Sequence, residues 1–365
     1  MSFFQQEYII LHDMIKSDYK VIGVMSGTSL DGIDLAYITF RFADKVGFEI
    51  QHAETVAYSN TWRKQLSKLT EMELDDLKRL DNSYTVYLSE VINNFIKTHR
   101  LDDVDAICSH GHTALHRPQD GLTYQIGNLP VLAELTNHKV VCDFRVQDVK
   151  LGGQGAPLVP IGDQLLFSNY DYCINLGGFA NISFEEEGLR IAYDICPVNT
   201  VLNYYAELLG ESYDAEGKIA ASGKVDQTLL QQLNELPFYK MSSPKSLGLE
   251  WVKHTVLPII DTFDLAIPDV IATFTEHVAV QIAAVVHKDS KILCTGGGTY
   301  NTYLLSRIEH LKDIEITHTK KNLIEFKEAL IFGLLGVLKL RDAINCLASV
   351  TGACHDHSSG EIYNP

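Results

Sequence analysis

The residues best suited to chemistry lie in a glycine-containing stretch near the start of the chain. Val21–Asp34 begins as an apolar run and ends as a polar turn. Gly27 and Gly32 can adopt backbone angles closed to other residues, so the main chain between them can direct amide N–H groups at an anion. The hydroxyls of Thr28 and Ser29 lie in the same segment. This pattern predicts a cradle for phosphate.

Two aspartates end this stretch. Asp31 and Asp34 would repel a bare phosphate, but carboxylates can hold a divalent cation that bridges phosphate oxygens, directly or through water. Gly27–Asp34 is therefore a candidate nucleotide site, with Asp31 and Asp34 as candidate metal ligands. A plain polar β-turn is the alternative, because the apolar run Leu35–Phe40 follows at once.

Two further glycine turns, Gly177–Asn181 and Gly296–Asn301, each close an apolar strand. A loop with few side chains lets a ligand approach the main chain, and a helix start behind it favours phosphate. Turns of this kind in both halves suit a duplicated fold that holds one nucleotide between its lobes; three unrelated turns are the simpler explanation.

The chain has no P-loop pattern. Gly296-x-Gly298 approaches a dinucleotide fingerprint, but the next strand, Ile314–Thr317, does not end in a carboxylate.

A single carboxylate, Asp194, follows the expected strand Leu189–Tyr193 and precedes a turn that contains Pro197. A carboxylate held rigidly at a strand end is suited to act as a general base toward a hydroxyl group or water. A helix N-cap is the competing role, because a helix is expected from about Thr200, although Asn199 is better placed to cap it. The residues alone leave both roles open.

Other polar groups have a structural and a functional interpretation. Asp143 and Arg145 share one face of an expected strand, as an ion pair or a substrate clamp. Gly152–Pro157 suits either a linker or a hinge. Three histidines suggest a metal site: His110, His112 and His116. Pro118 would end a helix at once and no cysteine completes a tetrahedral set, so hydrogen-bonding roles are favoured.

Hydrophobic periodicity places these residues between strands and helices. Expected strands are Tyr19–Met25, Leu35–Phe42, Gly47–Tyr58, Ala106–Ser109, Val140–Phe144, Tyr172–Leu176, Ile182–Phe184, Leu189–Tyr193 and Lys291–Cys294. Expected helices are Asn82–His99, Thr200–Leu209, Thr273–His287, Thr302–Leu311 and Glu325–Asn345. Because the pattern of strand, glycine turn and strand occurs twice, we expect an α/β protein with two related domains.

Composition narrows the function classes. The 365 residues are 46% hydrophobic, enough for two cores. A net charge of −17 without a dense basic cluster argues against nucleic acid and anionic membranes as partners. Seven dispersed cysteines indicate reduced thiols, and the first twenty residues lack a signal-peptide pattern. We therefore expect a cytoplasmic protein.

Taken together in their order, the motifs resemble those of the anhydro-N-acetylmuramic acid kinases, within the sugar kinase, heat-shock ATPase and actin fold group. The matching segments are Gly23–Asp34, Ser109–Thr113, Gln125–Asn128, Asp143–Arg145, Gly152–Pro160, Asn175–Ser183, Pro244–Ser246 and Gly296–Gly298. The resemblance extends from about residue 20 to the closing helix.

The resemblance implies an ATP-dependent enzyme of cell-wall recycling, which opens the 1,6-anhydro bridge of anhydro-N-acetylmuramic acid and forms N-acetylmuramic acid 6-phosphate. It assigns Asp194 as the base that activates water. Implied ATP contacts are Gly27, Thr28, Ser29, Leu30, Asp31, Gly32, Ile33, Asp34, Gly177, Gly178, Gly296, Gly297 and Gly298. Implied sugar contacts are His112, Thr113 and Arg145.

Two departures from the family pattern concern the proposed site. Ile195 to Val198 replace a glycine-rich turn after the base, and His112 stands where glutamine is usual. A catalytically impaired sugar or nucleotide sensor and a kinase with an ordinary hydroxyl acceptor are the rival functions.

The sequence therefore predicts a two-domain fold of residues 1–140 with 325–365, and 141–324. ATP and Mg²⁺ would bind in an interdomain cleft. The oligomeric state, for which a homodimer is one option, stays open.

Overall fold

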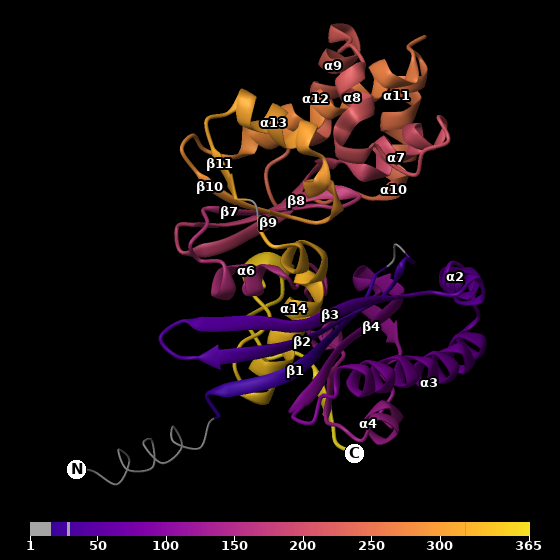
Figure 1. Cartoon of the computed structure of the whole chain (residues 1–365), viewed down its shortest axis with the longest axis vertical. Helices are drawn as coiled ribbons and strands as arrows, with labels where there is room; N and C mark the ends of the chain where they lie inside the picture. The colour runs from indigo at the N-terminus through magenta and orange to yellow at the C-terminus, as the bar shows by residue number, and fades with distance from the viewer. Residues whose placement is uncertain (1–15, 28–29, 318) are drawn as a thin grey trace. The chain divides into compact units, whose positions relative to one another are not determined.

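The computed structural model describes residues 16–27, 30–317 and 319–365, which form two compact units (Figure 1). One unit comprises the described residues up to Leu166 together with Phe326–Pro365, and the other comprises Phe167–Glu325. The first unit thus extends beyond the expected limit at residue 140. Segment 141–166 belongs to it because helix α6 (Pro160–Leu166) packs against helix α14 (Lys321–Leu340), with a buried Asp163–Lys327 ion pair at 2.7 Å.

A mixed sheet forms the centre of the first unit, in the order β12-β6-β4-β1-β2-β3, with β5 paired to β4. Its strands are β1 (Asp18–Ser26), β2 (Gly32–Phe42), β3 (Val46–Ala57), β4 (Ala106–Arg117), β5 (Leu122–Ile126), β6 (Val140–Cys142) and β12 (Glu361–Tyr363). The first three form an antiparallel meander, and β4 runs parallel to both β1 and β6.

Helices cover both faces of this sheet. Helix α3 (Leu74–His99) places Tyr84, Leu88 and Phe95 at helical spacing on the face that carries Ile22 and Val24 of β1. Alternate residues of β1 point to the other face, where Gly23 lies against the backbone of α14. The remaining helices of the unit are α2 (Asn60–Leu66), α4 (Val131–Thr136), α5 (Val146–Lys150), α6 and α15 (Ala348–Thr351).

The second unit repeats the strand order of the first. Its sheet runs β11-β10-β7-β8-β9, which corresponds to β6-β4-β1-β2-β3 in the first unit. The strands are β7 (Tyr172–Leu176), β8 (Phe179–Glu186), β9 (Leu189–Pro197), β10 (Lys291–Thr295) and β11 (Glu315–Thr317). The main helices are α7 (Asn199–Glu207), α12 (Ile267–Val285) and α13 (Thr302–Leu311), accompanied by the short helices α8 (Lys218–Ser222), α9 (Gln227–Asn234), α10 (Leu249–Trp251) and α11 (Leu257–Asp261). The expected duplicated α/β fold is confirmed.

Several strand ends differ from their predicted positions: β2 begins at Gly32 rather than Leu35, β8 spans Phe179–Glu186 rather than Ile182–Phe184, and three further ends concern site residues. Strand β4 continues through the polar segment predicted to follow it, and β9 continues through Asp194. Strand β6 ends at Cys142, because Asp143 adopts a φ of +57°, outside the β region. Polar side chains and sheet bulges interrupt the alternation of apolar and polar residues, so hydrophobic periodicity does not predict where these strands end.

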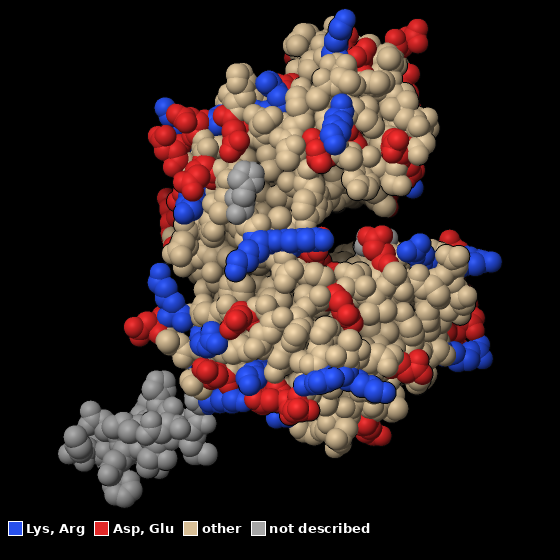
Figure 2. Space-filling view, in the orientation of Figure 1, with Lys and Arg blue, Asp and Glu red and all other residues tan. Residues whose placement is uncertain are grey.

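The surface in Figure 2 shows Lys and Arg side chains interspersed with Asp and Glu rather than gathered in one place. Among the described residues, no helix is long and apolar enough to cross a membrane.

Candidate functional site

The turn between β1 and β2 starts from a buried hydroxyl cluster. Ser26, the last residue of β1, lies with its Oγ 2.7 Å from Nδ1 of His112 and 2.5 Å from the Tyr58 hydroxyl. Tyr84 donates its hydroxyl to the same Oγ at 3.1 Å and lies 2.5 Å from the Tyr58 hydroxyl. These contacts fix the main chain immediately before Gly27.

His112 reaches Ser26 because of an irregularity in β4. Between the pairs Val24–Ser109 and Ser26–His112, β4 carries one residue more than β1, which is a bulge that redirects its side chains. The His112 side chain is only 2% exposed, and burial lowers its pKa to about 4. The ring is therefore neutral near pH 7 and holds the turn as a hydrogen-bonding group.

The described residues of the turn differ in exposure. Leu30 adopts a φ of +61° and its N–H donates to the Gly27 carbonyl at 3.4 Å. Asp31 is exposed, and Asp34 accepts a hydrogen bond from Thr55 at 2.6 Å. Two further residues of the predicted site are packed inside the protein: Gly32 packs against β3, and the Ile33 side chain is fully buried. Only the main chain of Ile33 can therefore face a ligand. Thr28 and Ser29 lie outside the described residues.

Arg145 is held from two sides at the start of α5. Its Nε donates to Nε2 of His110 at 2.9 Å, and its Nη1 donates to the Gly155 carbonyl at 2.6 Å. Nδ1 of His110 lies 2.9 Å from the Gly111 carbonyl, so that nitrogen carries the proton and Nε2 accepts. Burial, followed by the Arg145 charge, keeps the pKa of His110 well below its usual value.

The expected pairing of Asp143 with Arg145 on one strand face is wrong. Asp143 accepts a hydrogen bond from Asn128 at 2.9 Å, and burial raises its pKa to about 6. The predicted histidine roles agree better with the structure. His116 lies 3.1 Å from the Thr123 hydroxyl, so each of the three histidines of β4 has its own hydrogen-bond partner.

Two more polar residues of the first unit, Thr113 and Glu328, belong to the candidate site. Thr113 is half-buried in β4, opposite Gln125 of β5. Glu328, on the exposed side of α14, is an acidic group that the sequence did not point to. Desolvation raises the pKa of its carboxylate, the Arg145 charge opposes this rise, and the negative charge of Asp34 adds to it. The charges of Arg145 and Asp34 therefore both act on Glu328.

Asp194 lies within β9 rather than after it. Asn181 pairs with Asp194 and Ala180 pairs with Cys196, so Ile195 is an extra residue that forms a bulge beside the carboxylate. The side chain is half-buried, and its Oδ2 accepts a hydrogen bond from the Leu247 N–H at 2.8 Å.

The contacts of Asp194 exclude the helix-capping role. Burial raises the pKa of the carboxylate, and the hydrogen bond from Leu247 opposes that rise. The Asp194 N–H donates to the Lys245 carbonyl at 3.1 Å, so the 245–247 segment holds this residue by both main chain and side chain. Helix α7 begins after Val198 without any side-chain cap, which makes the capping role for Asp194 wrong. The Pro244–Ser246 motif marked this segment but did not indicate its contact.

The two glycine turns of the second unit lie side by side, because β7 and β10 are parallel neighbours. Gly296 has a φ of +82°, and a Cβ atom on Gly298 would lie 2.8 Å from the Leu176 Cβ, so both positions require glycine. A Cβ on Gly297 would have no neighbour within 4 Å. The Gly178 carbonyl accepts hydrogen bonds from the N–H groups that open α7.

The chain resembles known proteins over nearly its whole length. The family model for anhydro-N-acetylmuramic acid kinase matches residues 19–365. The anhydro-N-acetylmuramic acid kinase of Saccharophagus degradans is 35% identical over 94% of this chain and 98% of its own length. That of Pseudomonas syringae pv. tomato is 36% identical over 95% and 99%.

Among solved structures, component A of the (R)-2-hydroxyglutaryl-CoA dehydratase of Acidaminococcus fermentans aligns with a TM-score of 0.41 and 12% identity, over 88% of this chain and 99% of that chain. The family model matches across both units, and these relatives are more than 30% identical over nearly their whole length. These two findings establish family membership. The chain belongs to the anhydro-N-acetylmuramic acid kinase family.

Proposed function

We propose that this protein is an ATP-dependent kinase that hydrolytically opens 1,6-anhydro-N-acetylmuramic acid and phosphorylates O6, giving N-acetylmuramic acid 6-phosphate and ADP. The observation that carries the proposal is the half-buried Asp194 carboxylate, oriented by the Leu247 N–H and with a raised pKa. Membership of the family supplies the substrate class.

The substrate explains why a base is needed. An anhydro sugar has no free 6-hydroxyl, so water must attack the anomeric carbon. Asp194 accepts a proton from that water as the new C1–O bond forms and the C1–O6 bond breaks. The released O6 takes the γ-phosphoryl group of ATP. A base fixed by two main-chain contacts needs little reorganisation to reach the transition state, which favours catalysis.

The glycine turns suit the phosphates. In the second unit, Gly297 leaves its main chain open to approach, and the first N–H groups of α7 hold the Gly177–Gly178 turn in place. In the first unit, we assign ATP contacts to Gly27–Asp34. Mg²⁺ prefers carboxylate oxygen and water ligands, so the exposed Asp31 and the half-buried Asp34 fit it. When bound, it would neutralise charge on the transferred phosphoryl group.

Sugar recognition is assigned to β4 and α5. Arg145 has two of its N–H groups engaged by His110 and Gly155, which orients the guanidinium for a polar substituent of the sugar. Thr113 lies on the same strand as His110. His112 supports the site by holding Ser26. Because the enzyme uses ATP and acts in peptidoglycan recycling, we place it in the cytoplasm.

Incubation with ATP, Mg²⁺ and the anhydro sugar in ¹⁸O-labelled water, followed by mass spectrometry, tests this function. The proposed enzyme adds both a phosphoryl group and one solvent oxygen to the sugar. A kinase with an ordinary hydroxyl acceptor adds phosphate without solvent oxygen, and a sensor forms no product; either outcome overturns the proposal.

Asp194→Asn tests the assigned base. This change should abolish product formation while ATP binding persists. Asp313→Asn, at an exposed carboxylate of the same unit, is the matched control and should retain turnover. Turnover by the Asp194→Asn protein would exclude Asp194 as the base.

A further inference from the structure

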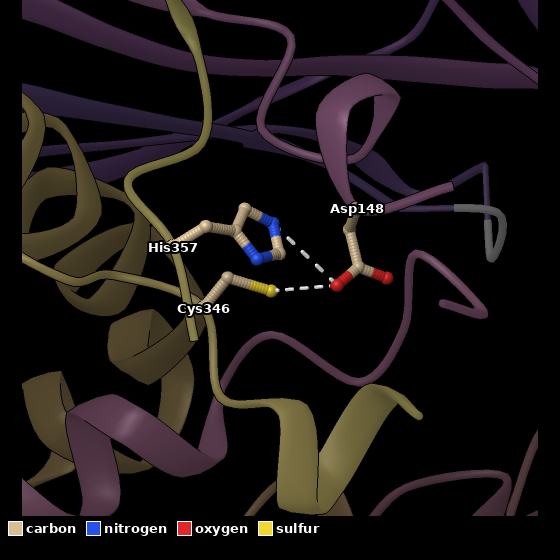
Figure 3. A group of neighbouring side chains, drawn as sticks. All are labelled: Asp148, Cys346 and His357. Atoms are coloured by element: carbon tan, nitrogen blue, oxygen red, sulfur yellow. Dashed lines mark hydrogen bonds and ion pairs between the residues drawn. The ribbon is translucent and has the colours of Figure 1, made fainter. Parts of the chain in front are cut away.

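Three potential metal ligands meet in the interior of the first unit, apart from the residues assigned to catalysis. Asp148 projects from α5, whereas Cys346 and His357 come from the C-terminal segment, and Figure 3 shows the three side chains pointing toward one another. Their relative exposures are 0%, 1% and 5%. One ligand atom from each lies within 4.8 Å of the other two.

The His357 ring has one nitrogen without a hydrogen bond. Its Nδ1 lies 3.0 Å from the His355 carbonyl, which can only accept, so Nδ1 carries a proton. Nε2 is buried, has no hydrogen-bond partner among the described residues, and lies 3.6 Å from Oδ1 of Asp148. In the neutral ring, Nε2 thus directs a lone pair at a carboxylate oxygen, an arrangement that a cation between them would stabilise.

Asp148 is oriented by its own contacts. Oδ1 accepts hydrogen bonds from the Cys346 thiol at 3.0 Å and from the Thr351 hydroxyl at 2.6 Å. Oδ2 accepts from the Gly155 N–H at 2.7 Å. A backbone donor on one carboxylate oxygen and a backbone carbonyl on the far nitrogen of a histidine are the contacts that orient ligands in metal sites.

We propose that Asp148, Cys346 and His357 bind one zinc ion through Oδ1, Sγ and Nε2. Zinc takes mixed oxygen, sulfur and nitrogen donors in tetrahedral geometry, in which neighbouring ligand atoms are about 3.2–3.7 Å apart. The Sγ–Oδ1 and Nε2–Oδ1 distances of 3.0 and 3.6 Å require only small shifts to match, whereas the Sγ–Nε2 distance, which is at most 4.8 Å, must fall to about 3.7 Å. On binding, the Cys346 S–H bond breaks, its proton passes to solvent, and the thiolate electron pair forms the Zn–S bond. Water supplies the fourth ligand.

The site has a structural consequence. A zinc ion there would tie the C-terminal segment to α5 and, through the Asp148–Gly155 hydrogen bond, to the loop whose Gly155 carbonyl holds Arg145. Because metal binds the folded chain and not the unfolded one, zinc should raise the thermal unfolding midpoint of this unit.

Cobalt titration of chelator-treated full-length protein tests the site, because a thiolate-to-cobalt charge-transfer band reports a direct bond to cysteine sulfur. We expect one Co²⁺ per chain with that band, displaced by Zn²⁺. Cys346→Ser should abolish the band, and His357→Gln should weaken binding by about tenfold or more. Matched controls are Cys354→Ser and His355→Gln, at exposed positions of the same segment, which should bind as the original protein does.

The original protein decides the question even if a variant fails to fold. Absence of a stoichiometric charge-transfer band would overturn the proposal. A band that persists in folded Cys346→Ser protein, or that Cys354→Ser removes, would also overturn it. None of these readouts depends on the proposed kinase activity.

Discussion

Replacing His112 by Gln should change how the stability of the first unit depends on pH. In the unfolded chain a histidine takes up a proton near its ordinary pKa of 6.5, whereas burial lowers the pKa of His112 to about 4 in the folded state. Proton uptake therefore favours unfolding as pH falls through this interval. At about 1.4 kcal/mol per pKa unit, the loss of stability between pH 7 and pH 4 is on the order of 3 kcal/mol. Gln cannot titrate, so the variant should lack this component.

The chain offers a local probe for the measurement. Trp62 stacks on Tyr87 at 4.9 Å between ring centroids and meets the edge of Tyr84 at 5.4 Å, beside the Ser26 cluster. The other tryptophan of the chain, Trp251, lies in the second unit. In a Trp251→Phe background, urea unfolding followed by fluorescence therefore reports the unit that contains His112.

Comparison between variants isolates His112 together with its electrostatic coupling to His110. The His112 charge lowers the pKa of His110, so the contribution of His110 does not cancel fully in the difference. His355→Gln, at an exposed site, is the control and should leave the pH profile unchanged. If His112→Gln and the reference protein lose stability in parallel between pH 7 and pH 4, the inference of a buried neutral imidazole at this position is refuted.

Two further predictions concern the second unit. Gly297→Ala should leave the unfolding temperature unchanged, because the added methyl group meets no neighbour. The same methyl group should raise KM for ATP about tenfold, because it obstructs the approach of a phosphate to the main chain. Gly298→Ala should instead destabilise the protein by about 1–3 kcal/mol, because its methyl group would contact Leu176. Equal KM values for Gly297→Ala and the original protein would argue against a phosphate contact there. Separately, kcat/KM should fall toward acid with an apparent pKa above 3.8, because burial raises the pKa of Asp194 and the base must be ionised. An acid limb at or below 3.8 would contradict this assignment.

The sequence predicted the elements that depend on local patterns. The buried faces of α3 and the strands that precede the three glycine turns follow from spacing alone, and the repeated strand–turn–strand pattern indicated the duplication that the two sheets display. It also drew attention to Asp194 and Arg145. Their partners could not be predicted, because Leu247 and His110 lie 53 and 35 residues away along the chain.

The sheet bulges are the clearest example of a feature that the sequence did not predict and the tertiary structure shows. One extra residue in β4 turns His112 toward Ser26, and one in β9 places Ile195 beside Asp194, yet neither insertion disturbs the composition or the hydrophobic pattern. The cluster of Asp148, Cys346 and His357 likewise joins one residue to two others that lie about 200 positions later in the chain, with no recognisable spacing. Residue types and local periodicity determined the secondary structure and the chemistry available to this protein. Only the tertiary structure decided which groups meet, because such contacts depend on strand register and chain topology, which are properties of pairing between distant segments.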